Sequence, residues 1–137
     1  MSTSPQFAAT PNKGTPGVLT AANTAVDGTG ATGRLLAFTA AAGGSFLPSI
    51  RYLHKGTNVA TVMRVFRNNG SDPEVASNNT LIAERTITGN TLSQTAESIK
   101  YENVLNLVLA NGERIYVTMG TAVAAGIHVS PINGGDL

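Results

Sequence analysis

Short apolar runs alternate with polar turns along most of this chain, and no segment has the roughly 3.6-residue apolar spacing of an amphipathic helix. From residue 34 onward, turn sequences rich in Gly, Asn and Asp recur about every 8–15 residues, a spacing typical of all-β domains. The alanine-rich stretch 121–126 is too short to be more than a turn. The pattern therefore predicts eight strands, at residues 17–26, 34–40, 46–54, 58–67, 81–87, 99–110, 113–120 and 126–132.

The number and spacing of these strands, within 137 residues, predict an all-β fold. The expected architecture is an antiparallel β-sandwich, jelly-roll-like, with about eight strands and an extended N-terminal arm. Alternation within the strands also predicts which side chains point inward, and it leaves His128 pointing outward. The side chains expected to share core faces are Leu36, Phe38, Ile50, Tyr52, His54, Leu105, Leu107, Leu109, Ile115, Val117, Met119, Ile127 and Val129.

The first 33 residues form a separate region, made of an extended N-terminal arm and the first strand, and residues 34–137 form the sandwich body. Prolines at positions 5, 11 and 16 exclude a continuous helix and a central strand in this region. Two interpretations of residues 1–16 stay open: a disordered tail, or an arm that becomes ordered on a neighbouring subunit. The glycine-rich sequence at 28–33 is expected to be a flexible joint between the arm and the body.

The segment 58–67 is an unusual strand, because both of its faces are partly apolar and each carries an arginine. One face holds Met63 and Arg67, and the other holds Arg64 and Phe66. If the strand has the core on one side, its second side either meets a partner or leaves the arginines solvated. Glu84 and Glu102 are candidate partners of these arginines because they lie on strands. The candidate interface residues are Met63, Arg64, Phe66, Arg67, His54 and His128.

Only 12% of the residues are charged and the net charge is +1, whereas about a quarter are charged in a typical soluble domain. This balance argues against a nucleic-acid binder, which needs a basic field. A surface with so few charges is easily desolvated and suits a permanent contact. With no basic and apolar leader at the N-terminus and no run of about 18 apolar residues, we expect a soluble chain made in the cytosol, without membrane contact.

Residues that carry chemistry are sparse. The chain has no cysteine, so it has neither a disulfide nor a thiolate metal site. His54 and His128 lie in no catalytic motif, and the eight acidic residues show no pairing pattern. The loop 71–79 could offer oxygens to calcium, but it lacks the alternating acids of a calcium loop and is expected to be a plain exposed loop. We therefore expect no enzyme activity, no cofactor and no metal.

A set of motifs from about residue 30 to the C-terminus resembles a family of small proteins encoded among the virion genes of tailed bacteriophages and prophages. The motifs are LLAFTAAAGGSF, RYLHKGTNVATVMRVFRNNG, NNTLIAERTI, LANGERIYVTMGTAVAAGIHVS and a closing GGD. Each motif alone is strand-and-turn chemistry, and only the set is specific. Among phage proteins of this size, the chain is similar to the jelly-roll capsid cement, or decoration, proteins of podovirus-like phages.

This resemblance implies a structural task without catalytic residues. Such a protein binds the outer surface of the capsid after synthesis in the host cytoplasm, bridges major capsid protein subunits and stabilises the shell. The implied partners are the major capsid protein and other copies of the chain, as a homodimer or a homotrimer. The alternative is a phage tail or fibre component that recognises the host surface. The small share of aromatic residues, 5%, counts against this alternative, because aromatic side chains are the ones that stack on sugars.

Overall fold

The computed structural model describes residues 9–137, which form ten strands and one 3₁₀ turn. One sheet, called the β4 sheet, contains β1, β2, β4, β7, β9 and β10, and the other, called the β5 sheet, contains β3, β5, β6 and β8. The bounds are β1 Thr10–Pro11, β2 Gly17–Leu19, β3 Arg34–Thr39, β4 Ser45–His54, β5 Thr61–Asn68, η1 Ala76–Asn78, β6 Asn79–Ile87, β7 Tyr101–Leu109, β8 Arg114–Met119, β9 Ile127–Ile132 and β10 Gly135–Asp136.

The ten strands occupy eight positions in the two sheets, because β1 shares one position with β2 and β9 shares another with β10. β1 pairs with β10 and β2 pairs with β9 in one continuing register, so β1 and β2 lie end to end. β9 and β10 likewise follow one another along the same edge of β4. The order in the β4 sheet is then β1/β2, β9/β10, β4 and β7, and the order in the β5 sheet is β3, β8, β5 and β6.

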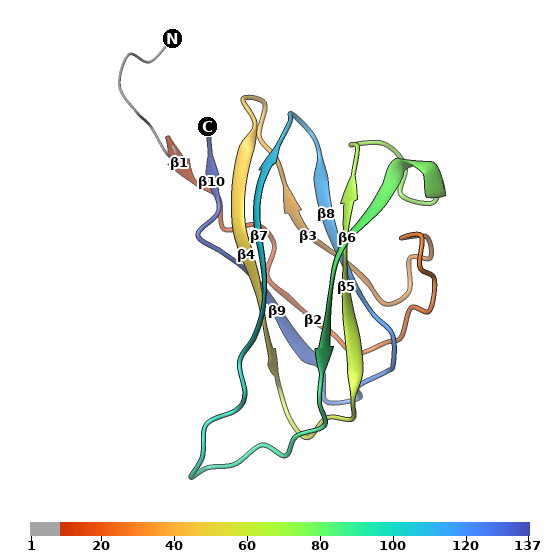
Figure 1. Cartoon of the computed structure of the whole chain (residues 1–137), viewed down its shortest axis with the longest axis vertical. Coiled ribbons are helices and arrows are strands. Elements are labelled where there is room, and N and C mark those ends of the chain that lie inside the picture. The colour runs from red at the N-terminus through yellow and green to blue at the C-terminus, as the bar shows by residue number, and fades with distance from the viewer. Residues whose placement is uncertain (1–8) are drawn as a thin grey trace.

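This order confirms the antiparallel β-sandwich and gives it the nesting of a jelly roll. The first position pairs with the last, β3 with β8, β4 with β7, and β5 with β6, and every pairing is antiparallel. A long hairpin rolled on itself produces this nesting. Figure 1 shows the two layers and, at one end, the connection between β6 and β7 extending away from the body.

The core lies between the sheets, and alternation predicted most of it. Ile115, Val117 and Met119 of β8 are fully buried, as predicted. The β4 residues expected to point inward are buried as well, and so are Ile127 and Val129, which flank an exposed His128. The β4 residues meant are Ile50, Tyr52 and His54, and Leu47 is fully buried in the core as well.

One of the inward assignments is wrong because a bulge shifts the alternation. Leu36 was expected to share a face with Phe38, but Phe38 is fully buried while Leu36 is 37% exposed. The register shifts between these two residues, and a bulge of this kind places residues two positions apart on different faces. In β7, Leu109 is buried, whereas Leu105 and Leu107 are only half-buried against the core.

From residue 9 onward, the N-terminal segment contacts the sandwich body of the same chain. The Ala9 amide donates to the Asp136 carbonyl at 2.7 Å, and the Thr15 amide donates to the Ala37 carbonyl at 2.8 Å. The Asn12 side chain donates to the Asp136 carboxylate at 2.8 Å. Of the expected first strand 17–26, only Gly17–Leu19 is a strand. Residues 1–8, where the arm was expected to begin, lie outside the described residues.

Candidate interaction surface

The strand β5 has its core side and its outer side both occupied by its own chain. Met63 and Val65 are fully buried in the core. Phe66 is also fully buried but does not belong to that core cluster. The register places Phe66 beside Tyr116 of β8 and Leu81 of β6, on the outer face of the β5 sheet. The interface assignment of Met63 and Phe66 is therefore corrected, because neither side chain has surface left for a partner.

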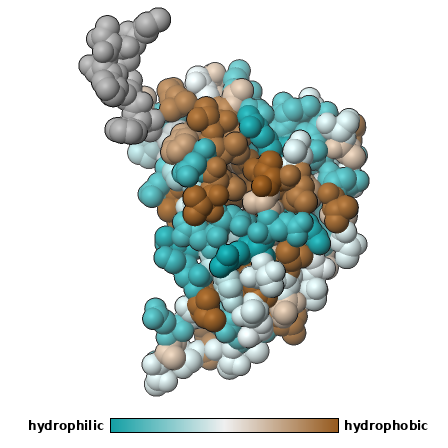
Figure 2. Space-filling view, viewed as in Figure 1, coloured by the Kyte–Doolittle hydropathy of each residue, from teal (hydrophilic) through white to brown (hydrophobic). Residues whose placement is uncertain are grey.

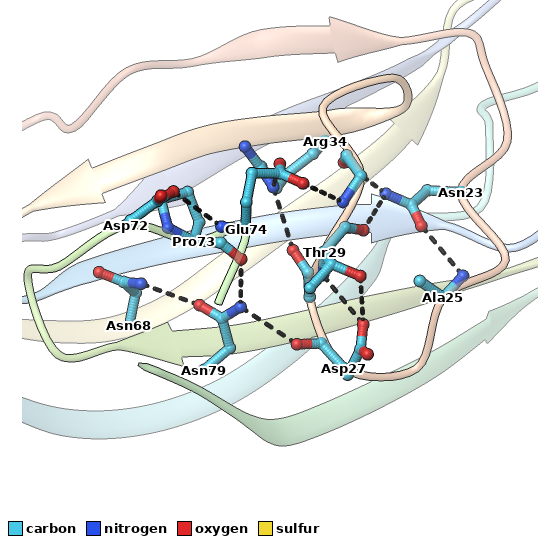
Figure 3. Close-up of polar contacts among 12 residues, drawn as sticks. Asn23, Ala25, Asp27, Thr29, Arg34, Asn68, Asp72, Pro73, Glu74 and Asn79 are labelled. Carbon is cyan, nitrogen blue, oxygen red and sulfur yellow. Dashed lines mark hydrogen bonds and ion pairs between the residues drawn. The ribbon is translucent and has the colours of Figure 1, made fainter. Parts of the chain in front are cut away.

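Two loops cover part of this outer face and are tied to each other by polar contacts. The loop before β3, residues 23–33, meets the loop between β5 and β6, residues 69–78, as Figure 3 shows. The Asn79 amide group donates to the Asp27 carbonyl at 3.1 Å and to the Pro73 carbonyl at 2.7 Å, and so joins both loops. The glycine-rich sequence is therefore a fastened loop in this structure, whereas we expected a flexible joint.

Arg34 bonds both loops. Its guanidinium lies 5.1 Å above the ring of Tyr116. Its Nη1 donates to Glu74 Oε1 at 2.6 Å and to the Gly28 carbonyl at 3.2 Å. The hydrogen bond from Arg34 first, and then the one from the Gly30 amide to Glu74 Oε2, hold the pKa of the Glu74 carboxyl below its ordinary value. The loops are therefore best fastened while Glu74 is ionised.

The two arginines of β5 have different surroundings, and neither forms an ion pair with the expected acids. Arg67 bonds Glu113, with Nε 2.9 Å from Oε2 and Nη2 2.7 Å from Oε1. Arg64 lies opposite Glu84 in the register, but within residues 9–137 the two side chains form no ion pair. Arg64 is half-buried, and its Nε has no hydrogen-bond partner there.

The two histidines lie on the paired strands β4 and β9 but on opposite faces of the β4 sheet. His54 is 5% exposed at the end of β4, and its Nδ1 lies at hydrogen-bond distance from the Gly56 carbonyl, 2.5 Å away. Its assignment as a contact residue is corrected, because the chain itself encloses the ring. His128 is exposed on the outer face of the β4 sheet, where the register places it between Leu53 and Val18. The candidate contact residues that retain surface are therefore Arg64, Arg67 and His128.

The most exposed large apolar side chain of residues 9–137, that of Val104, lies on the outer face of the β4 sheet. Val104 is 71% exposed and Val108 is 58% exposed, both on β7. Phe46 of β4 lies opposite Val108 of β7. Ser49 of β4 lies between Val104 of β7 and Ile132 of β9, so the apolar residues are spread over three neighbouring strands. We call this set the outer apolar patch; its members are Phe46, Pro48, Val104, Val108 and Ile132.

The patch continues around the free edge of β7 into a gap between β7 and β6. Half-buried apolar side chains of both edge strands line this gap, which we call the β6–β7 seam; they are Ile82, Ala83, Leu105 and Leu107. At one end, Arg85 lies 5.6 Å from the ring of Tyr101, and at the other Arg67 Nη2 donates to the Val108 carbonyl at 3.4 Å. Figure 2 shows the hydrophobic residues gathered over the upper part of β7 and extending toward β6.

A pocket of about 470 Å³ adjoins the patch at the end of β7. Its walls are residues 42–44 and 108–111, together with Arg67 and Leu137. Four of the nine lining residues are glycine or alanine and three more are valine or leucine, which leaves the pocket open and short of polar side chains. Because the guanidinium of Arg67 is already bonded to Glu113, the pocket offers a partner mainly apolar contact.

Elsewhere the described residues offer little chemistry. Across residues 9–137, no three His, Asp or Glu side chains are grouped closely enough to hold a metal ion. The same residues include no helix of the length and apolarity needed to span a bilayer. The candidate functional site is therefore a contact surface.

Comparison with known proteins adds no relative. No model of a known protein family matches the chain, and no curated protein matches it by sequence.

The outer apolar patch was missed by sequence reasoning, although a signal for it exists. In the segment NVLNLVLA, residues 103–110, leucines occupy one parity while Val104 and Val108 occupy the other. An edge strand that is apolar on both parities has one apolar side without a core to cover it. The same reasoning was applied to the strand 58–67, where the chain's own loops cover the second side.

Proposed function

We propose that this chain is a structural virion protein whose task is adhesion without catalysis. The outer apolar patch is the observation that supports this proposal most directly. Monomeric soluble proteins rarely expose contiguous apolar surface unless a partner covers it. The patch carries Val104 and Val108, which are 71% and 58% exposed beside β4, so no other segment of residues 9–137 covers them.

Within that class we propose a capsid cement protein of a tailed bacteriophage. It binds the outside of the head after synthesis in the host cytoplasm and bridges major capsid protein subunits. The jelly-roll fold is compatible with this role, since viral capsid proteins use it, but lectins and other proteins use it too. The assignment to the phage head rests on the resemblance of the strand and turn motifs.

A symmetric shell strengthens the attachment of a protein of this kind. One small apolar contact gives weak affinity. Many copies on a symmetric shell, each held at more than one point, gain effective concentration without any new kind of contact. The low charge supports such close placement, because the net charge of +1 produces little repulsion between neighbouring copies.

The test measures where the chain is found in the virion. Particles of the phage that encodes it are disrupted gently, and the ratio of this chain to the major capsid protein is determined by quantitative mass spectrometry of heads and tails separately. A fixed ratio in the head fraction is expected. Recovery from tails alone would favour the tail or fibre alternative and contradict the cement role.

A further inference from the structure

The outer apolar patch is bordered along the β4 sheet by a pair of opposite charges. Arg51 of β4 and Glu102 of β7 are direct neighbours in the antiparallel register. Both lie on the outer face, since their flanking residues Tyr52 and Asn103 point inward and are buried. Despite this proximity they form no ion pair with each other, and residues 9–137 hold only two ion pairs, Arg34–Glu74 and Arg67–Glu113.

We propose that a second copy of this chain covers the outer apolar patch, in a two-fold face-to-face contact between β4 sheets. A two-fold contact brings the same patch of both subunits together, so each feature must complement its own symmetry mate. An axis that runs along the strands, midway between β4 and β7, meets this condition. It places Arg51 of each copy over Glu102 of the other.

The same axis matches apolar groups with apolar groups. Phe46 of each copy faces Val108 of the other, because these two residues are cross-strand neighbours in β4 and β7. Val104 faces the small Ser49, which leaves room for the most exposed apolar side chain of the patch. The strands of the two stacked sheets run nearly parallel, as in the aligned packing of β-sandwiches.

The charges also favour a second copy over a partner of uniform charge. The patch and its border together carry one positive and one negative group. A strongly acidic or strongly basic partner would therefore place a like charge over one of the two. Arg51 forms no ion pair within residues 9–137, and its buried Nε has no hydrogen-bond partner there, so no carboxylate of the same chain holds its guanidinium. A carboxylate above the guanidinium supplies an acceptor for the remaining donors.

Packing of the sheet faces suits β7 better than pairing of its edge. Asn106 lies in the middle of β7 with a φ of 46°, and the register with β4 shifts at the same place. A bulge of this kind interrupts the row of edge groups that another strand would pair with. This leaves the side-chain face as the continuous contact surface of β7.

This inference deepens the proposed function by naming what covers the patch, and the two can fail separately. Self-association is measured on the purified full chain, without any capsid, by sedimentation equilibrium. We expect a reversible dimer. A chain that stays monomeric up to its solubility limit would overturn the two-fold contact while leaving attachment to the shell to be decided by the head fractions.

Substitutions in the patch test the location of the contact. Val104→Lys is expected to weaken dimerisation at least about tenfold, because it places two lysines in an apolar contact. Val59→Lys is the matched control, since Val59 is 56% exposed and lies outside the patch, and it should leave the dimer unchanged. Equal effects of both substitutions, or none from Val104→Lys, would place the contact elsewhere.

Charge reversal tests the symmetry. Arg51→Glu alone and Glu102→Arg alone each put like charges together twice per dimer and should each weaken it. An equimolar mixture of the two variants restores opposite charges at both positions, so we expect heterodimers with affinity close to that of the original chain. Failure of the folded variants to complement each other would contradict the exchange of Arg51 and Glu102. If Arg51→Glu does not fold, Glu102→Arg and Val104→Lys still decide whether this face is used.

Discussion

Arg67 and Glu113 form a two-pronged ion pair that fastens β5 to the turn between β7 and β8. The guanidinium Nε and Nη2 lie 2.9 and 2.7 Å from the two carboxylate oxygens. Glu113 also accepts the Ala110 amide at 2.7 Å, which closes the Asn111–Gly112 turn. The Arg67 side chain is 34% exposed and that of Glu113 is 16% exposed, so solvent screens the pair in part.

Glu113→Gln should therefore lower the free energy of unfolding by about 1 kcal/mol at neutral pH. The hydrogen bond from Arg67 holds the pKa of Glu113 below its ordinary value of 4.5. A lowered carboxyl pKa gives stability that is present above the ordinary value and lost as the pH falls through the folded-state pKa. The difference between the original chain and the variant should thus shrink at acid pH.

Urea unfolding at about pH 7 and about pH 3 measures this difference. Glu97→Gln is the control, because Glu97 is exposed and has no ion pair within residues 9–137. A variant as stable as the original at both values would show that the pair contributes nothing measurable.

Leu109 and Leu107 give a second prediction, on packing. Both belong to one parity of β7, but Leu109 is fully buried whereas Leu107 is half-buried at the β6–β7 seam. Leu109→Ala should cost about 2–5 kcal/mol, since it leaves a cavity in the core. Leu107→Ala should cost about 1–2 kcal/mol, because part of the lost surface already meets water. Denaturant unfolding of both variants measures the two losses in unfolding free energy. Equal losses would contradict the half-buried position of Leu107 at the β6–β7 seam.

The strands and most core positions could be predicted from the sequence, because alternation and turn residues are local signals. Leu36 was misplaced for a physical reason, since a bulge changes the parity of a strand without a mark in the sequence. The burial of Phe66 could not be predicted, because it depends on loops that meet across 40 or more residues, as in the contact between Arg34 and Glu74. The exposure of Val104 could be inferred from its parity, but only once β7 was known to be an edge strand.

The Arg34–Glu74 contact gives a third prediction, on loop motion. Glu74→Gln should speed hydrogen exchange of the Gly30 amide, which donates to Glu74 Oε2 at 3.1 Å. The pKa of Glu74 lies below its ordinary value because Arg34 and Gly30 donate to the ionised carboxylate. In the original chain the same loosening should therefore appear only as the pH falls below about 4.5.

Exchange measured residue by residue, with amides of the buried β8 as an internal reference, separates local from global opening. Glu84→Gln is the control, because Glu84 is exposed on β6 and forms no ion pair in the described part of the chain. If the Gly30 amide exchanges equally fast in both variants, Glu74 does not fasten the loop.

The N-terminal segment gives the last prediction, because its two halves should behave differently. Removal of residues 1–8 keeps every contact described for residues 9–137, so the thermal midpoint should fall less than after the longer deletion. Removal of residues 1–16 also deletes β1, the amide bond from Thr15 to Ala37, and the Asn12 side chain that bonds Asp136. The structure therefore predicts a lower midpoint for the longer deletion. If the arm serves attachment, both truncated chains bind isolated phage heads more weakly than the full chain in a co-sedimentation assay. Full binding by the chain that lacks only residues 1–8 would show that those residues are not part of the attachment.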